Sequence, residues 1–349
     1  MNIDEMESTA RALVAEGKGI LAADESLGTI EKRFRPINLP STEENRRAYR
    51  ELLFTTPKLG QYISGVILFD ETIRQKARDG TPFPEVLRGQ GIIPGIKVDK
   101  GAKPMAGFPD EKVTEGLDGL RARFKEYYEL GARFSKWRAV ISIGENIPTD
   151  ACLAANAQAL ARFAALSQEA SLVPIVEPEV LMDGDHTIER CEAVTQKTQH
   201  IVFDALFDQR IILEAMLLKP NMVVPGNDCP RQVSPAEVAE ATMHCLRRGV
   251  PVAVPGIVFL SGGQSEVEAT QNLNAISQLG PHPWHVSFSF GRALQDAALK
   301  TWAGDPNNIV DAQKALLRRA KANSAAQTGS YSAEFETAPV SLRPSPVPV

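Results

Sequence analysis

Eight short apolar segments recur along the chain, each flanked by glycine, proline or charge, and this pattern restricts the folds that the chain can adopt. Their ranges are 19–24, 62–69, 92–99, 134–140, 173–180, 213–220, 253–262 and 285–292. Continuous apolar runs of this length, separated by helical stretches, are typical of parallel strands buried on both faces of a sheet. The clearest helical stretch is 150–170, and the capping box at 234–237 predicts the start of another helix.

The polar ends of these segments are spaced by about 38 residues on average, which leaves room for a crossover helix after each strand. Eight such strands favour an α/β fold with a single closed (β/α)8 TIM barrel over an open doubly wound sheet. The alternative is that one or two of the runs are turns of buried helix. We expect the barrel catalytic domain over 1–322, and a mobile Pro/Ser-rich tail without helix over 323–349.

Charge and cysteine spacing exclude several classes of protein. The 349 residues carry 38 Lys+Arg against 43 Asp+Glu, a formal net charge of −5 that argues against a nucleic-acid-binding protein. No apolar run approaches the ~18 residues of a membrane helix, and residues 1–19 lack the apolar centre of a signal peptide. Cys152, Cys191, Cys229 and Cys245 are widely spaced, as expected for buried thiols of a cytoplasmic protein.

Charged and hydroxyl side chains occur where the predicted strands end, although a buried strand has no structural need for them. They are Asp24, Lys97, Asp99, Lys136, Arg138, Glu177, Glu179, Lys219, Ser261 and Arg292. All eight carboxyl ends of a TIM barrel open onto one mouth, where active sites lie. For any single pair a salt bridge that closes the barrel is an equal alternative, but the full set favours catalysis.

This predicted mouth is rich in cations although the chain is acidic, which favours an anionic substrate, with phosphate as the simplest anion. The sequences Ser261-Gly262-Gly263 and Phe290-Gly291-Arg292 follow the last two strands, where barrels commonly bind phosphate through loop N–H groups. The five histidines form no HExxH motif, and no glycine-rich nucleotide motif is present. We therefore expect no metal and no organic cofactor.

Lys219 differs from the other cations because it follows the apolar run 213–218 and precedes a proline. A lysine amine is mostly protonated at neutral pH, but partial desolvation and a nearby cation such as Lys136 would favour the neutral form. A neutral amine attacks a ketone and forms a Schiff base, which withdraws electrons from the substrate. For an isolated lysine, the alternative is a phosphate contact or an ion pair.

Nine segments in sequence order closely resemble the class I fructose-1,6-bisphosphate aldolases, over about residues 6–325. They are GILAADES (19–26), EENRR (43–47), GVILF (65–69), GIKVDKG (95–101), KWR (136–138), PIVEPE (174–179), LLKPNMV (217–223), FLSGGQSE (259–266) and SFGRALQ (289–295). The resemblance implies a (β/α)8 barrel, usually a homotetramer, without metal or cofactor. It also implies reversible cleavage of fructose 1,6-bisphosphate to the triose phosphates dihydroxyacetone phosphate and glyceraldehyde 3-phosphate.

The resemblance further implies individual residue roles. Lys219 matches the Schiff-base lysine, Glu177 the acid that expels water from the carbinolamine, and Asp24 the carboxylate that takes the C4-hydroxyl proton. Lys136 matches the lysine that places positive charge beside the imine, and Glu179 matches its supporting carboxylate. The matching substrate- and phosphate-binding residues are Thr29, Lys32, Arg33, Lys97 and Arg138 for the aldehyde half, and Ser261, Gly262, Ser289, Gly291 and Arg292 for the ketone-side phosphate.

Three features depart from the family pattern. Phe290 stands where tyrosine is common, and Thr29 stands where serine is common. Many members end in a tyrosine that exchanges the enamine proton, whereas this chain ends in Val349 and its last tyrosine is Tyr331. Either water or another group then performs that step, or enamine protonation is slow in this protein. The alternatives for function are a transaldolase-type enzyme, a preference for a seven-carbon 1,7-bisphosphate, and a scaffold protein that has lost its activity.

Overall fold

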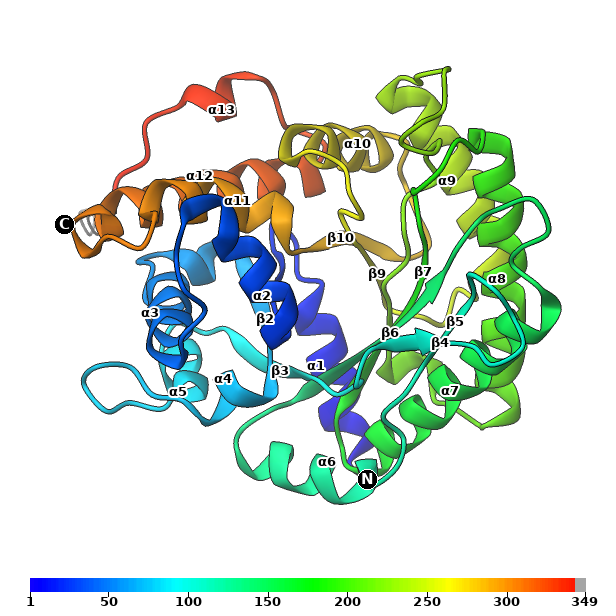
Figure 1. The fold of residues 1–349 in the computed structure, drawn as a ribbon, viewed down its shortest axis with the longest axis horizontal. Helices are drawn as coiled ribbons and strands as arrows, with labels where there is room; N and C mark the ends of the chain where they lie inside the picture. The colour runs from blue at the N-terminus through cyan, green and yellow to red at the C-terminus, as the bar shows by residue number, and fades with distance from the viewer. Residues whose placement is uncertain (343–349) are drawn as a thin grey trace.

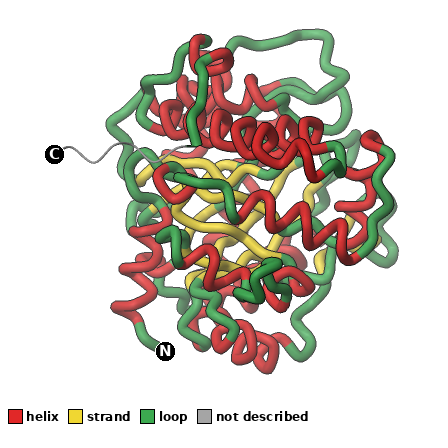
Figure 2. The backbone as a smooth tube through the Cα atoms, turned by 90° about the vertical axis from the view of Figure 1, so that its left-hand side faces the viewer, coloured by secondary structure: helices red, strands yellow, loops and turns green. Residues whose placement is uncertain are grey.

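The computed structural model describes residues 1–342, and in it eight parallel strands close into a barrel surrounded by helices (Figure 1 and Figure 2). The strand order around the barrel is β1-β10-β9-β8-β7-β6-β3-β2. The strands are β1 (Gly19–Ala23), β2 (Ile63–Leu68), β3 (Ile93–Lys97), β6 (Phe134–Ile141), β7 (Val173–Val180), β8 (Leu217–Leu218), β9 (Gly256–Phe259) and β10 (His285–Phe290). Each lies within one of the eight predicted segments or overlaps it, so the predicted TIM barrel is confirmed.

Two strand details differ from the prediction. β8 has only two residues, because Leu213–Ala215 at the start of that apolar run forms a 3₁₀ turn. This part of the run is therefore a helical turn, as the alternative interpretation allowed, but of its residues only Ala215 is buried. A short antiparallel hairpin, β4 (Ala102–Pro104) with β5 (Lys112–Thr114), was not predicted and follows β3.

Helices fill the connections between strands. The predicted helix 150–170 is α7 (Asp150–Glu169), and the predicted capping box at Ser234 and Glu237 is present at the start of α9 (Pro235–Gly249). The other α-helices are α1 (Ile3–Leu13), α2 (Leu27–Phe34), α3 (Glu43–Phe54), α4 (Asp70–Arg74), α5 (Phe83–Arg88), α6 (Leu120–Glu129), α8 (Ile188–Asp208), α10 (Glu266–Gln278), α11 (Arg292–Trp302), α12 (Ile309–Gln327) and α13 (Glu334–Thr337).

The expectation of a helix-free segment from residue 323 is wrong for the residues that the structure describes. α12 continues to Gln327, because Asn323 is fully buried and can form hydrogen bonds inside the protein. Its amide oxygen accepts from Thr270 Oγ1 at 2.8 Å, and its amide nitrogen donates to the Arg319 carbonyl at 2.9 Å. Residues 343–349 of the expected tail lie outside the described residues.

Two further sequence expectations concern membranes and cysteines. Within residues 1–342, no helix combines the length and the apolar character needed to cross a membrane. The four cysteines are all buried and free, as predicted from their spacing.

Candidate active site

Strand alternation carries the apolar interior of the barrel into a polar mouth. Ile175 on β7 and Leu217 on β8 belong to the apolar cluster inside the barrel, which also contacts α1. Side chains two residues apart on a strand face the same side, so Glu177 follows Ile175 on the inner face and Lys219 follows Leu217. Lys136 likewise stands two residues after an inward-facing phenylalanine of β6. The strands therefore direct these charges into one opening.

A cavity of about 200 Å³ lies at this opening. It is lined by Ala22, Asp24, Glu25, Ser26, Thr29, Arg33, Lys97, Lys136, Arg138, Glu177, Glu179, Lys219, Leu260, Ser261, Gly262, Ser289, Gly291 and Arg292. The structure thus brings together the residues predicted for the site except two. Lys32 is exposed on α2 outside the cavity lining, and Asp99 is buried behind Lys97, with which it pairs. Sequence reasoning missed Glu25 and Ser26, although both directly follow Asp24 and precede a helix start.

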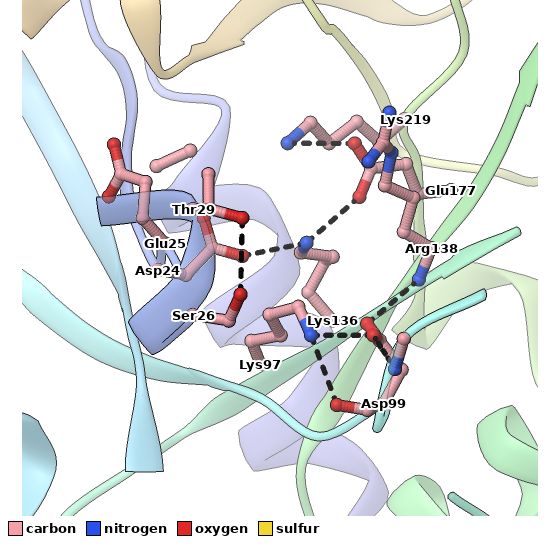
Figure 3. A network of polar contacts seen from close by, with 12 residues as sticks. Asp24, Glu25, Ser26, Thr29, Lys97, Asp99, Lys136, Arg138, Glu177 and Lys219 are labelled. Carbon is pink, nitrogen blue, oxygen red and sulfur yellow. Dashed lines mark hydrogen bonds and ion pairs between the residues drawn. The ribbon is translucent and has the colours of Figure 1, made fainter. Parts of the chain in front are cut away.

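Four charged groups from four strands form a continuous chain across the cavity (Figure 3). Lys136 Nζ lies 2.7 Å from Asp24 Oδ2 and 3.1 Å from Glu177 Oε2. The other carboxylate oxygen of Glu177 lies 3.1 Å from Lys219 Nζ. These side chains are between 4% and 13% exposed, so the attraction between them is weakly screened by water. Negative and positive groups alternate in the order Asp24, Lys136, Glu177, Lys219.

This alternation controls protonation. Burial alone would raise the pKa of Asp24, but the positive charges of Lys136 and Lys219 outweigh burial and lower that pKa to about 2. Burial opposes the same shift at Glu177, where Lys136 and Lys219 again lower the pKa of the carboxyl group. For Lys136, burial is outweighed by Asp24 and Glu177, which raise the pKa of its amine. The free site therefore holds two carboxylates around one permanent ammonium.

Two further cations are fixed at the cavity by carboxylates. Arg138 forms an ion pair with Glu179, and this charge, acting against the effect of burial, raises the pKa of the guanidinium. Lys97 Nζ lies 2.5 Å from Asp99 Oδ1 and 3.0 Å from the Asp99 carbonyl oxygen. Both cations are held in defined positions before any ligand binds.

The other part of the cavity is built from loops that precede helices. Gly291 is the N-cap of α11, and Arg292 Nη2 donates to the Gly262 carbonyl at 3.3 Å. Gly262 has φ +59°, a conformation that glycine adopts without strain. The buried Ser289 hydroxyl has no hydrogen-bond partner within residues 1–342. An open helix N-terminus, a free hydroxyl and a guanidinium together suit a phosphate group.

A second helix N-terminus borders the same cavity. α2 begins after Ser26, whose hydroxyl makes no capping bond and instead lies 3.1 Å from Thr29 Oγ1. Arg33 lines the cavity from the last turn of α2. The N-terminus of α11 lies beside that of α2, because β1 and β10 are paired neighbours in the barrel. Arg138 on β6 and Lys97 on β3 stand farther around the barrel from β9 and β10, so the cavity has cations on two sides, which fits a substrate that carries two phosphates.

Comparison with known proteins agrees with this geometry. The family model "Fructose-bisphosphate aldolase class-I" matches residues 5–342. The chain is 59% identical to a probable fructose-bisphosphate aldolase class 1 of Xanthomonas campestris, over 95% of this chain and 99% of that protein. It is 56% identical to a cytosolic fructose-bisphosphate aldolase of Arabidopsis thaliana, over 95% and 85% of the two chains.

A solved structure is also closely similar. It contains fructose-bisphosphate aldolase from Plasmodium falciparum in complex with TRAP and a small-molecule inhibitor, and it superposes with a TM-score of 0.94. The sequence identity is 53%, over 95% of this chain and 96% of that chain. The likeness therefore extends over almost the whole chain.

A barrel whose mouth joins a buried lysine to a carboxylate, with cations on two sides of the cavity, fits a lyase of the Schiff-base type that acts on phosphorylated carbonyl compounds. The chain belongs to the class I fructose-bisphosphate aldolase family. It cleaves fructose 1,6-bisphosphate reversibly to dihydroxyacetone phosphate and glyceraldehyde 3-phosphate, a reaction of glycolysis and gluconeogenesis.

The charge chain makes a prediction about acid stability. Because Asp24 has an ordinary pKa of 3.8 when unfolded and about 2 when folded, its ion pair stabilises the fold by about 2 kcal/mol above pH ~4. This contribution is lost as the pH falls toward 2. In Lys136→Met the effect of burial on the pKa of Asp24 meets less opposition, so the loss of stability between pH ~4 and pH ~2 should shrink or change sign.

The measurement is the free energy of urea unfolding between pH 7 and pH 2 for both proteins. Lys197→Met is the matched control, because Lys197 pairs with Asp150 at the surface, where both side chains are more than half exposed. Such a pair contributes ~0–1 kcal/mol, so the control should follow the wild type. Parallel curves for Lys136→Met and the wild type would contradict the assigned ion pair.

Proposed function

We propose that Lys219 forms the Schiff base with the substrate ketone, with Glu177, Asp24 and Lys136 as its catalytic partners. The observation that carries this proposal is the continuous chain of alternating charges from Asp24 to Lys219. A carboxylate bonded to two amines can pass a proton between them and the substrate without leaving its place. The family resemblance implies that Glu179 supports Lys136, but within residues 1–342 the ion pair of Glu179 is with Arg138, so we assign it to the cationic side of the site through that residue.

Imine formation starts when Lys219 transfers a proton to Glu177, 3.1 Å away, and its nitrogen lone pair attacks C2 of the open-chain ketone. The new N–C bond leaves a positive nitrogen and a negative oxygen, and one N–H proton moves to that oxygen to give the hydroxyl of a carbinolamine. Glu177, now protonated, gives its proton to this hydroxyl, and water leaves as the iminium forms. The proton count is balanced, and Glu177 returns to the carboxylate that the free site favours.

Cleavage follows from the opposite side of the site. Asp24 is ionised at neutral pH and accepts the proton of the C4 hydroxyl. The C3–C4 bond breaks, its electron pair moves onto C3 as the iminium becomes an enamine, and glyceraldehyde 3-phosphate leaves. Lys136 remains an ammonium between both carboxylates and balances their charge throughout. Protonation of the enamine at C3 and hydrolysis of the resulting imine release dihydroxyacetone phosphate.

Substrate binding is assigned to the two flanks of the cavity. We place the ketone-side phosphate at Ser261, Gly262, Ser289, Gly291 and Arg292. The aldehyde half is assigned to Thr29, Lys32, Arg33, Lys97 and Arg138. The free hydroxyl of Ser289 and the N-terminus of α11 support the first assignment. Lys97 and Arg138 support the second, because β3 and β6 stand farther around the barrel from β9 and β10. For Lys32, which lies outside the cavity lining, the family resemblance is the support.

Tyr331 does not line the cavity, so water or another group is assigned the enamine proton. Its hydroxyl donates to Glu336 Oε1 at 2.7 Å, and burial together with Glu336 raises the pKa of Tyr331 to about 12. Both features keep this phenol in its neutral form and away from the substrate.

Replacing Lys219 tests the nucleophile. Lys219→Met should abolish turnover, because no other group in the proposed site can form the covalent electron sink. Borohydride reduction in the presence of dihydroxyacetone phosphate should attach the triose to the wild-type chain at residue 219 and leave Lys219→Met unlabelled. Peptide mapping locates the label. A label on another lysine, or full activity of Lys219→Met, would contradict the assignment.

Asp24 should affect a different step. Asp24→Ser should lose cleavage by at least ~10²-fold, in the range of a general base, while imine formation remains measurable by the same trapping. The two steps separate because Lys219 contacts Glu177 and not Asp24. Equal loss of trapping and cleavage would show that Asp24 is needed for the site as a whole and not for the C4 proton.

We further propose a cytoplasmic homotetramer. The names of the Arabidopsis thaliana relatives, which are called cytosolic, support the first part, and the family resemblance supports the second. Light scattering of the eluted protein should give about four times the chain mass of 38.0 kDa. A particle with the mass of one chain or of two chains would contradict the tetramer.

Comparative kinetics on six- and seven-carbon bisphosphates determines the substrate preference.

A further inference from the structure

Two acidic residues follow each other at the end of β1, and they are turned in opposite directions. Asp24 points toward Lys136, whereas Glu25 points away from it (Figure 3). Glu25 still lines the cavity, and its side chain is 12% exposed. A carboxylate at this place would repel an anionic substrate, so its orientation requires an explanation.

The structure holds Glu25 through both of its carboxylate oxygens. Arg50 Nη2, on α3, lies 2.8 Å from Glu25 Oε2. Gln295 Nε2, on α11, donates to Glu25 Oε1 at 3.0 Å and to the Ala22 carbonyl at 2.7 Å. The Ala22 bond fixes the backbone two residues before Asp24. One small network therefore controls both the end of β1 and the acid that follows Asp24.

The parts of this network are themselves fixed by packing. Tyr49 donates from its hydroxyl to Gln295 Oε1 at 3.1 Å, which orients the amide. The Tyr49 ring stacks on Trp302 with a centroid distance of 5.4 Å and meets Phe34 edge-on at 5.7 Å. Burial and the charge of Glu25 raise the pKa of Tyr49, so the phenol keeps its proton and remains the donor.

Arg50 is a buried charge whose ionic partner is Glu25. Its side chain is 3% exposed, and within residues 1–342 it forms a single ion pair, with Glu25. Its Nη1 has no hydrogen-bond partner in the same part of the chain. A buried arginine with one counter-ion is a poor source of stability, since desolvation offsets most of the attraction. Glu25 nevertheless gains a fixed partner outside the substrate path.

We propose that Arg50 and Gln295 are positioning residues that hold the Glu25 carboxylate away from the bound substrate and keep Asp24 directed at Lys136. This inference rests on the proposed role of Asp24. When the clamp is lost, Glu25 is free to turn into the cavity, where it repels the substrate phosphates and competes with Asp24 for the ammonium of Lys136. The loss therefore falls on substrate binding and on cleavage, not on folding alone.

The test is Arg50→Met together with the double variant Arg50→Met/Glu25→Gln. Arg50→Met should lower kcat/KM by about 10²-fold, the size expected when a catalytic group moves by about 1 Å. Part of this loss should be a raised KM that falls again with added salt, because salt screens the repulsion. The double variant removes the free carboxylate and should recover most of the lost kcat/KM.

The chain offers a matched control on the same helix. Arg46 Nε and Nη2 lie 2.7 and 2.6 Å from the two oxygens of Glu71, and neither residue lines the cavity. Arg46→Met removes a partly buried ion pair of the same kind, so it should reduce stability and leave KM and its salt dependence unchanged. Borohydride trapping with dihydroxyacetone phosphate should label all of these variants at Lys219.

Several results would overturn the inference. Arg50→Met with wild-type kinetics would do so, as would a double variant no more active than Arg50→Met, because a purely structural ion pair predicts no rescue. Where Arg50→Met fails to fold, Arg50→Lys and Gln295→Met take its place, and wild-type kcat/KM in both has the same meaning. These failures leave the proposed function intact, because that function fails instead when Asp24→Ser cleaves normally or when Lys219→Met is active.

Discussion

The buried ammonium of Lys136 is the interaction on which the rest of the site depends. Taking a charge out of water costs several kcal/mol, and the cost is offset only where counter-charges meet it at short distance. Here Asp24 and Glu177 lie 2.7 and 3.1 Å away on two other strands. The register Arg138 with Glu177 between β6 and β7 sets one of these distances. The barrel therefore has to hold its strands in register for the charge to remain buried.

From this constraint come different roles for similar side chains. Glu177 has an amine on either side, so it can take a proton from Lys219 and return it to the leaving hydroxyl. Within residues 1–342, the ion pair of Asp24 is with Lys136 alone, which suits its proposed role as the base for a single proton. Glu25, the next residue, is turned out of the reaction by Arg50. The neighbouring residues, and not the residue type, therefore give these three carboxylates their different roles.

The fold and most of the site could be predicted because both depend on local pattern. Strand alternation and polar strand ends are visible in the sequence itself, and together they are sufficient to direct Glu177 and Lys219 to one mouth. Arg50 could not be found in this way, since EENRRAYRELL has the composition of a solvated helix and its partner lies 25 residues earlier. The sequence also could not show which of Lys32 and Arg33 lines the cavity. Adjacent helical residues point about 100° apart, and here only Arg33 lines it.

The C-terminal region shows why composition misled the prediction there. Arg319 is buried and donates to the carbonyl oxygens of Glu266 and Ala293, in the first turns of α10 and α11. These helices begin directly after the two proposed phosphate loops. Glu336 supplies the counter-charge for Arg319, and Tyr331 donates to the same carboxylate. Glu336 and Tyr331, which follow residue 322, thus help to hold an arginine that contacts the helices next to the proposed phosphate loops. Tyr331 consequently contributes to the fold, which agrees with the proposal that water or another group supplies the enamine proton.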